Sequence, residues 1–384
     1  MTPSDIGADR GRSRARERGV TFEGTAPGPL NAITDVDGVA VGHATLITGS
    51  GPLRVGEGPI RTGVTVVLPR RSAPADPVFA GWFALNGNGE MTGAAWVAES
   101  GFAEGPIAIT NTHSVGVVRD AIIGWQASRG ALRQPWSLPI VAETYDGWLN
   151  DINGFHVKPE HVAAALDGAR DDAVAEGNVG GGTGMICYGF KGGIGTASRR
   201  LPDDDGGYTV GVLVQANFGR RDQVRIDGVP VGRVLARESN PSASDETPSA
   251  HATGLERADR DLGSIVAVVA TDAPLLPHQL ERLARRVSLG VARTGGTSAN
   301  SSGDLFIAFS TANAGAASAT PAAEVHMLSN DGITPLFDAT VYATEEAIIN
   351  ALFAAETMIG RDDHRIDALP IDRIIGILER HSRS

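Results

Sequence analysis

The sequence DLGSIVAVVATDAP, residues 261–274, is where a long polar segment ends and an apolar one begins. Residues 265–270 are rich in β-branched side chains, a composition typical of a strand buried on both faces. Ser264 stands at the start of this strand, and Gly263 before it can adopt backbone angles that other residues avoid. The stretch therefore predicts a rigidly held serine that follows a polar loop. An ordinary Gly-Ser strand start without chemistry has the same pattern.

The polar loop, residues 237–262, is the clearest break in the chain. It contains Pro241, Pro248 and several serines, and it has low hydrophobicity. Such a composition predicts a mobile and protease-accessible loop, although a simple insertion has the same appearance. Residues 1–28 carry five arginines between positions 10 and 18 and lack the apolar block of a signal peptide, so we expect a disordered tail there. The remainder, 29–384, is predicted to be a single catalytic domain.

Size and charge narrow the class of protein. A chain of 384 residues with 42% hydrophobic residues can bury a large core. The formal net charge of −12 should repel phosphate backbones and anionic membranes, so we expect neither nucleic acid nor a membrane as a partner. The sequence also lacks an uncharged apolar run of about 18 residues, the length of a membrane span. We therefore expect a globular protein of the cytoplasm.

Cysteine and histidine usage predicts neither a metal nor another cofactor. Cys187 is the only cysteine, and the nine histidines show no H-x-x-x-H or comparable spacing. A hydrolase of this composition needs a nucleophile that is activated in another way. One solution is to cut the chain before a serine, because the freed α-amine, with an unperturbed pKa of about 8, becomes a nearby base. Ser264 has the position that this solution requires.

Other candidate site residues lie at the ends of predicted strands. Glu143, Tyr145 and Trp148 can supply the carboxylate and the rings of a small cationic pocket, or they can form a half-buried polar turn. Asn217 ends another strand, where its amide can donate to a developing negative charge. The glycine-spaced polar turn within residues 81–93 should bring its backbone close to another segment.

The order of the predicted elements favours an α+β fold. Strands outnumber helices, the helices are few and long, and no regular βαβ alternation is present. Helical spacing of apolar residues begins near Leu280 and predicts a helix that ends at Gly290. A second helix is predicted to begin at Thr344 and to end before Gly360. Layered sheets covered by helices fit this pattern.

Short blocks of the sequence together resemble one known family. They are Asn31-Ala-Ile-Thr-Asp-Val, Thr110-Asn-Thr-His-Ser-Val-Gly, Glu143-Thr-Tyr, Gly180-Gly-Gly-Thr-Gly-Met, Gln215-Ala-Asn-Phe-Gly, Gly263-Ser-Ile-Val-Ala-Val-Val-Ala-Thr-Asp-Ala-Pro and Ser302-Gly-Asp. These blocks are similar, in this order, to those of the L-aminopeptidase D-amidase/D-esterase and β-aminopeptidase family. The resemblance covers most of the chain. It implies an αββα sandwich like that of N-terminal-nucleophile hydrolases, with different strand connections.

The resemblance also implies an activity and an assembly. The precursor would cleave itself between Gly263 and Ser264, giving an α chain, 1–263, and a β chain, 264–384, that begins with the nucleophile. The mature protein would release N-terminal residues from short peptides, aminoacyl amides and esters, without a metal or cofactor, as a homotetramer of αβ units. The preference among α-L, β and D substrates stays open.

Site roles follow from the resemblance residue by residue. Ser264 would attack the acyl carbon, while its own amine or Ser302 takes the proton. Ser302 and Asp304 would form a Ser-x-acid pair that orients and polarises the nucleophile, with Asp304 in a position where some members have the longer Glu. Asn217 would donate to the oxyanion, and Tyr145 would be an active-site tyrosine. Glu143 would bind the substrate's ammonium group, and Trp148 would form a wall of the substrate pocket.

Two other functions fit parts of the pattern. A self-cleaving acyltransferase of the ornithine acetyltransferase type would use Thr as its nucleophile, and Ser at position 264 argues against it. A non-catalytic protein would stay uncleaved and hold an anionic ligand with its glycine-rich loops.

Overall fold

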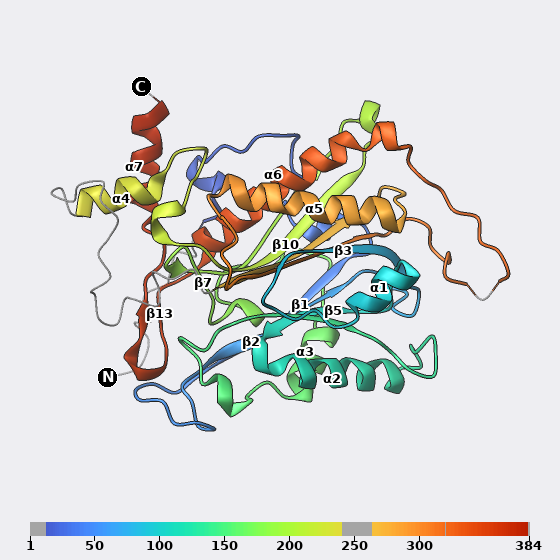
Figure 1. Ribbon diagram of the computed structural model, residues 1–384, viewed down its shortest axis with the longest axis horizontal. Helices are drawn as coiled ribbons and strands as arrows, with labels where there is room; N and C mark the ends of the chain where they lie inside the picture. Colours follow the sequence, from blue (N-terminus) through green and yellow to red (C-terminus); the bar gives the residue numbers. More distant parts are fainter. Residues whose placement is uncertain (1–12, 240–262, 319, 383–384) are drawn as a thin grey trace, which may run out of the picture.

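A computed structural model describes residues 13–239, 263–318 and 320–382. Two β-sheets stack face to face, and helices cover the outer face of each sheet, so the layers follow the order αββα (Figure 1). One apolar cluster fills the space between the two sheets. A second lies between the larger sheet and its helices, and a third between the smaller sheet and its helices. Burial of apolar side chains in three successive layers is what holds the sandwich together.

The larger sheet has six strands in the order β4-β3-β12-β11-β10-β9. Their bounds are Phe102–Ala103, Val78–Gly87, Gly303–Ser310, Ser264–Thr271, Thr209–Asn217 and Gly193–Arg200, in that order. The predicted buried strand is β11, and all of its residues are buried. It lies in the interior of the sheet, antiparallel to β10 and parallel to β12.

The smaller sheet has four strands in the order β1-β2-β5-β6. Their bounds are Ala40–Thr48, Ile60–Leu68, Ile107–Asn111 and Ile140–Thr144. Two short hairpins lie outside the main sheets: β7 with β8, at Ile186–Cys187 and Phe190–Lys191, and β13 with β14, at Met358–Ile359 and Arg365–Ile366. β6 pairs in parallel with β5, so residues that follow both strands meet at one edge.

The helices form the two outer layers. α5, Pro277–Arg293, and α6, Thr334–Ala354, cover the larger sheet, while α2, Val115–Ser128, and α3, Pro159–Asp167, cover the smaller one (Figure 1). Shorter helices are α1, Ala94–Ser100, α4, Val231–Ser239, and α7, Ile371–Ser382. No helix in the described ranges is both long enough and apolar enough to cross a bilayer.

Two predicted helix boundaries are wrong for the same reason. Gly290 does not end α5, because its bare Cα lies against α6, where an added Cβ would come within 2.5 Å of Thr344 Cβ. Thr344 does not begin a helix either, since α6 starts ten residues earlier. Close packing of the two helices therefore places Gly290 and Thr344 in helix interiors, although the local preferences of glycine and threonine predict helix ends.

The predicted disordered tail is wrong for residues 13–28. Ala15 is fully buried, and its amide donates to Asn350 Oδ1 on α6. Arg14 pairs with Glu176, and Arg16 with Glu346. The carboxylates that pair with these arginines lie far along the chain, which is why the local composition suggested disorder.

Residues 1–12 lie outside the described residues, as does most of the predicted mobile loop, 240–262. Residues 237–239 of that loop are the end of α4.

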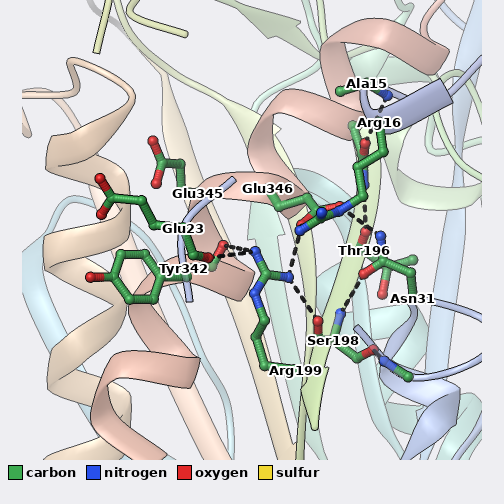
Figure 2. A network of polar contacts seen from close by, with 12 residues as sticks. Ala15, Arg16, Glu23, Asn31, Thr196, Ser198, Arg199, Tyr342, Glu345 and Glu346 are labelled. Atoms are coloured by element: carbon green, nitrogen blue, oxygen red, sulfur yellow. Dashed lines mark hydrogen bonds and ion pairs between the residues drawn. The ribbon is translucent and has the colours of Figure 1, made fainter. Parts of the chain in front are cut away.

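A buried ion-pair network fixes this segment to the fold (Figure 2). On α6, Glu346 Oε1 lies 2.6 Å from Arg16 Nε, and Glu346 Oε2 lies 2.8 Å from Arg199 Nη1. The side chains of Glu346 and Arg199 have no exposed area. The amide of Asn31 donates to Glu346, while its oxygen accepts the backbone N–H of Ser198 on edge strand β9. Burial favours the neutral acid, but the two guanidiniums outweigh it and hold the pKa of Glu346 below its usual value.

Removing Glu346 should therefore destabilise the whole domain. Glu346→Ala leaves the Arg199 guanidinium buried without its main counter-charge, and we expect a loss of about 3–5 kcal/mol in the free energy of unfolding. The matched control is Asp120→Ala, which breaks an exposed ion pair with Arg119 and should cost about 1 kcal/mol or less. Urea unfolding followed by circular dichroism measures both, and equal losses would contradict the role of this network.

Candidate active site

Ser264 is held at the point where three strands of the larger sheet meet. It begins β11 and pairs with Asn217, the last residue of β10. Its Oγ accepts a hydrogen bond of 2.9 Å from the backbone N–H of Gly303, the first residue of β12. The residue is 6% exposed, so Ser264 is buried at the edge of the sandwich.

Ser302 and Asp304 lie beside it on β12 and the preceding residues. The Ser302 hydroxyl donates to Asp304 Oδ1 over 2.6 Å, and the same oxygen accepts the backbone N–H of Ile265 over 3.2 Å. Ile265 follows Ser264 directly, so the carboxylate fixes the main chain next to the candidate nucleophile. Both Ser302 and Asp304 are buried. The structure thus brings the predicted Ser-x-acid pair to the start of β11.

The position before Ser264 has no room for a side chain, which explains why Gly263 stands there. A Cβ on this residue would lie 1.7 Å from the backbone oxygen of Asn217, a distance that real Cβ atoms do not show. The close approach of the two backbones explains a glycine directly before Ser264.

Asn217 has a fixed side-chain amide. Its Oδ1 accepts the backbone N–H of Ile186 over 2.8 Å, and its Nδ2 donates to the backbone oxygen of Tyr145 over 3.1 Å. These partners decide which end of the amide is the donor. Asn217 Nδ2 carries a second hydrogen besides the one that it donates to Tyr145.

Glu143 is a buried carboxylate at the end of β6. It is 4% exposed, its Oε1 accepts the backbone N–H of Glu90 over 3.1 Å, and Thr112 donates its hydroxyl to Oε2. Burial raises the pKa of Glu143 above its usual value, in spite of these two hydrogen bonds. A Cβ on Gly89 would lie 3.2 Å both from Glu143 Oε1 and from Gly303 Cα, so only Gly89 separates this carboxylate from the segment that contacts Ser264.

Tyr145 and Trp148 occupy different surroundings. Tyr145 is 46% exposed, and its backbone oxygen contacts Asn217. Trp148 stacks on His364 with ring centroids 4.0 Å apart and packs against the cluster of Leu149, Met358 and Ile366. The tyrosine thus adjoins the Ser264 edge directly, whereas the described contacts of the tryptophan ring are with the β13–β14 region.

Three further residues lie at the site without having been singled out from the sequence. Asn86 accepts the backbone N–H of Asp304 over 2.9 Å, and Thr112 binds Glu143 as described. Asp146 lies fully buried beside Tyr145, where burial raises its pKa to about 7. The signal for Asn86 was the glycine-spaced turn that contains it. The predicted close approach of this turn to another segment is confirmed, because a Cβ on Gly303 would lie 2.5 Å from the backbone oxygen of Asn88.

The site consists of hydroxyls, amides and carboxylates. Within the described ranges, no cluster of three or more His, Cys, Asp or Glu residues has the geometry to hold a metal ion. Such groups are those of nucleophilic acyl transfer: a hydroxyl that can attack, amide donors near it and a hydroxyl–carboxylate pair beside it.

Comparisons with known proteins agree with this geometry. The model of peptidase family S58 matches residues 31–366. The β-peptidyl aminopeptidase BapA of Sphingosinicella microcystinivorans is 53% identical over 374 residues, which are 96% of this chain and 93% of that protein.

Solved structures agree as well. A β-aminopeptidase of Burkholderia sp. is 48% identical with a TM-score of 0.84, and the match covers 96% of this chain and 99% of that one. The L-aminopeptidase D-Ala-esterase/amidase of Ochrobactrum anthropi, described as a prototype serine aminopeptidase with a variant of the Ntn-hydrolase fold, is 45% identical with a TM-score of 0.85, at the same coverage. These matches confirm the predicted fold class and the predicted family resemblance.

Proposed function

This chain belongs to peptidase family S58 and is a hydrolase of the aminopeptidase kind, and we propose that Ser264 is its nucleophile after self-cleavage of the Gly263–Ser264 bond. The observation that carries the proposal is the hydrogen bond from the Gly303 amide to Ser264 Oγ, next to the Ser302–Asp304 pair. A buried serine that is held in this way, directly after a tightly packed glycine, has the surroundings of a reactive residue.

Self-cleavage would proceed through an ester. Ser264 Oγ attacks the carbonyl carbon of Gly263, the C–N bond breaks, and the glycyl group moves from nitrogen to oxygen. Water then hydrolyses this ester, which leaves a carboxylate on Gly263 and a free α-amine on Ser264. The products are an α chain, 1–263, and a β chain, 264–384. The new amine is a base on the same residue as the nucleophile.

Peptide hydrolysis would use the same groups on a second carbonyl. Ser264 Oγ attacks the acyl carbon of the substrate, and its proton passes to the Ser264 amine or to Ser302. Ser302 already donates a hydrogen bond to Asp304, so in taking the Ser264 proton it would pass its own proton on to that carboxylate. The side-chain amide of Asn217 would donate to the oxyanion, a contribution worth about 3–4 kcal/mol for such donors. The scissile C–N or C–O bond of the substrate then breaks, and the leaving amine or alcohol takes the proton that Ser264 gave up. Water hydrolyses the acyl-enzyme, which releases the acid and restores the Ser264 hydroxyl.

Substrate recognition would depend on the free amino group of the substrate. Glu143 is the carboxylate that lies close to the Ser264 edge, and we propose that it binds the substrate ammonium, with Tyr145 and Trp148 as walls of the pocket. Short peptides, aminoacyl amides and esters all carry this group. We also propose that the protein acts in the cytoplasm as a homotetramer of αβ units, and a panel of α-L, β and D aminoacyl p-nitroanilides would define its preference.

Ser264→Ala tests the nucleophile and the cleavage together. We expect this variant to stay a single chain on a denaturing gel and to be inactive. Ser302→Ala should fold and lose about 100-fold or more in kcat, as expected for a general base. Ser128→Ala, an exposed serine on α2, is the control and should match the wild type. A processed and active Ser264→Ala protein would refute the assignment.

Glu143→Gln tests the ammonium anchor. Loss of a hydrogen bond between charges costs about 1.5–3 kcal/mol, so KM should rise about tenfold to a hundredfold while kcat changes less. In the wild type, KM should also rise as the pH falls through the raised pKa of Glu143, because the protonated acid no longer attracts an ammonium ion. This dependence should vanish in Glu143→Gln. A KM that equals that of Glu160→Gln, an exposed control on α3, would exclude this role.

A further inference from the structure

The turn at the end of β3 is tied to the segment that carries Ser302 and Asp304. Asn86 Oδ1 accepts the backbone N–H of Asp304 over 2.9 Å, and Asn86 Nδ2 donates to the backbone oxygen of Ala299 over 2.9 Å. One side chain thus holds both ends of the segment 299–304. Two residues later, Asn88 Nδ2 donates to the backbone oxygen of Ser301 over 2.7 Å.

A single peptide group connects this turn to the nucleophile. The carbonyl of Ser302 accepts the backbone N–H of Asn88 over 3.3 Å, and the N–H of Gly303, in the same peptide plane, donates to Ser264 Oγ over 2.9 Å. Because the peptide is planar, fixing its oxygen also fixes the direction of its N–H. The orientation of the donor on Ser264 is therefore set by the β3 turn.

A β-bulge places Asn86 in this position. Leu305 pairs with Ala84, but Asp304 pairs with Asn86, so the pairing skips Leu85. In an unbroken ladder, Asp304 would face Leu85, whose side chain cannot accept a hydrogen bond. The extra residue shifts the register by one and brings the amide of Asn86 to the face that carries Asp304, a use of bulges that is common beside active sites.

The two segments are also in direct backbone contact. A Cβ on Gly303 would lie 2.5 Å from the backbone oxygen of Asn88 and 2.7 Å from Gly89 Cα. With no side chain between them, the two backbones pack directly against each other, and close-packed groups of this kind transmit strain.

We propose that Asn86 is a positioning residue for the nucleophile, and this inference rests on the proposed function. Through Asp304 and the Ser302–Gly303 peptide, it keeps the Gly303 N–H aimed at Ser264 Oγ and the Asp304 carboxylate aimed at the main chain after Ser264. Asn86 itself does not act on the substrate. Its effect is on the rate of attack, since displacements of about 1 Å in such groups cost about 100-fold.

The chain contains a matched control for a purely structural role. Asn313 lies beyond the opposite end of β12 and makes the same kind of paired contact: its Oδ1 accepts the His326 N–H over 2.7 Å, and its Nδ2 donates to the His326 oxygen over 3.0 Å. Asn313→Ala removes equivalent bonds without touching the segment 299–304. The contacts of Asn313 are more exposed than those of Asn86, and Asn313 has a positive φ of 55°, so Asn313→Ala also carries backbone strain. A loss of kcat that is confined to Asn86→Ala therefore reports on the contact with the segment 299–304.

The experiment compares Asn86→Ala, Asn86→Asp and Asn313→Ala in the full chain. The processed fraction is read from a denaturing gel, and kcat, KM and the pH profile are measured on an aminoacyl p-nitroanilide, per titrated active site. For Asn86→Ala we expect kcat to fall about tenfold to a hundredfold with KM within about twofold, because Glu143 keeps its contacts.

Asn86→Asp keeps the oxygen that accepts the Asp304 N–H, so it should recover part of the rate. Its added negative charge opposes ionisation of Asp304, so the acid limb of kcat/KM should move to higher pH. Asn313→Ala should match the wild type in all of these measurements.

The inference is overturned if Asn86→Ala and Asn313→Ala have the same kcat in processed enzyme. If Asn86→Ala does not fold, Asn86→Asp decides, and an acid limb identical to that of the wild type overturns the inference. A wild-type enzyme that is fully active as one chain would instead refute the proposed function, independently of any Asn86 variant.

Discussion

The hydrogen bond from the Gly303 amide to Ser264 Oγ is the contact on which the site depends. It joins the first residues of two parallel strands, β11 and β12, which lie in the interior of the larger sheet between apolar layers. Packed cores of this kind resist small shifts, so the donor and the hydroxyl keep one geometry. The sandwich therefore supplies a rigid base, and the polar turns at its edge supply the chemistry.

The same division explains how much of the molecule could be predicted from its sequence. β11 could be predicted because burial on both faces leaves a continuous β-branched run. The packed segment 13–28 could not, because its stability comes from ion pairs such as Arg16–Glu346 between residues 330 positions apart, which leave no periodic pattern. The helix end predicted at Gly290 and the helix start predicted at Thr344 were wrong, because these two residues lie where α5 and α6 pack closely against each other.

The candidate site was predictable in its main residues and not in its supports. Ser264 could be singled out from its position at a strand start, whereas Ser302 and Asp304 were assigned only through the resemblance of their short block to a known family. The structure brings the three residues together. Asn86 was missed because its position depends on a register shift of one residue in β3, which no local pattern reveals. Trp148, which the resemblance assigns to the pocket wall, stacks its ring on His364, a contact between distant segments that the local sequence does not reveal.

Intact mass spectrometry of the active wild-type protein tests the central claim most directly. Under denaturing conditions, the account predicts two masses, one of which corresponds to a chain that begins at Ser264 and ends at Ser384, in an amount equal to the titrated active sites. A single mass for the continuous chain of 384 residues, in a preparation with full aminopeptidase activity, would contradict it.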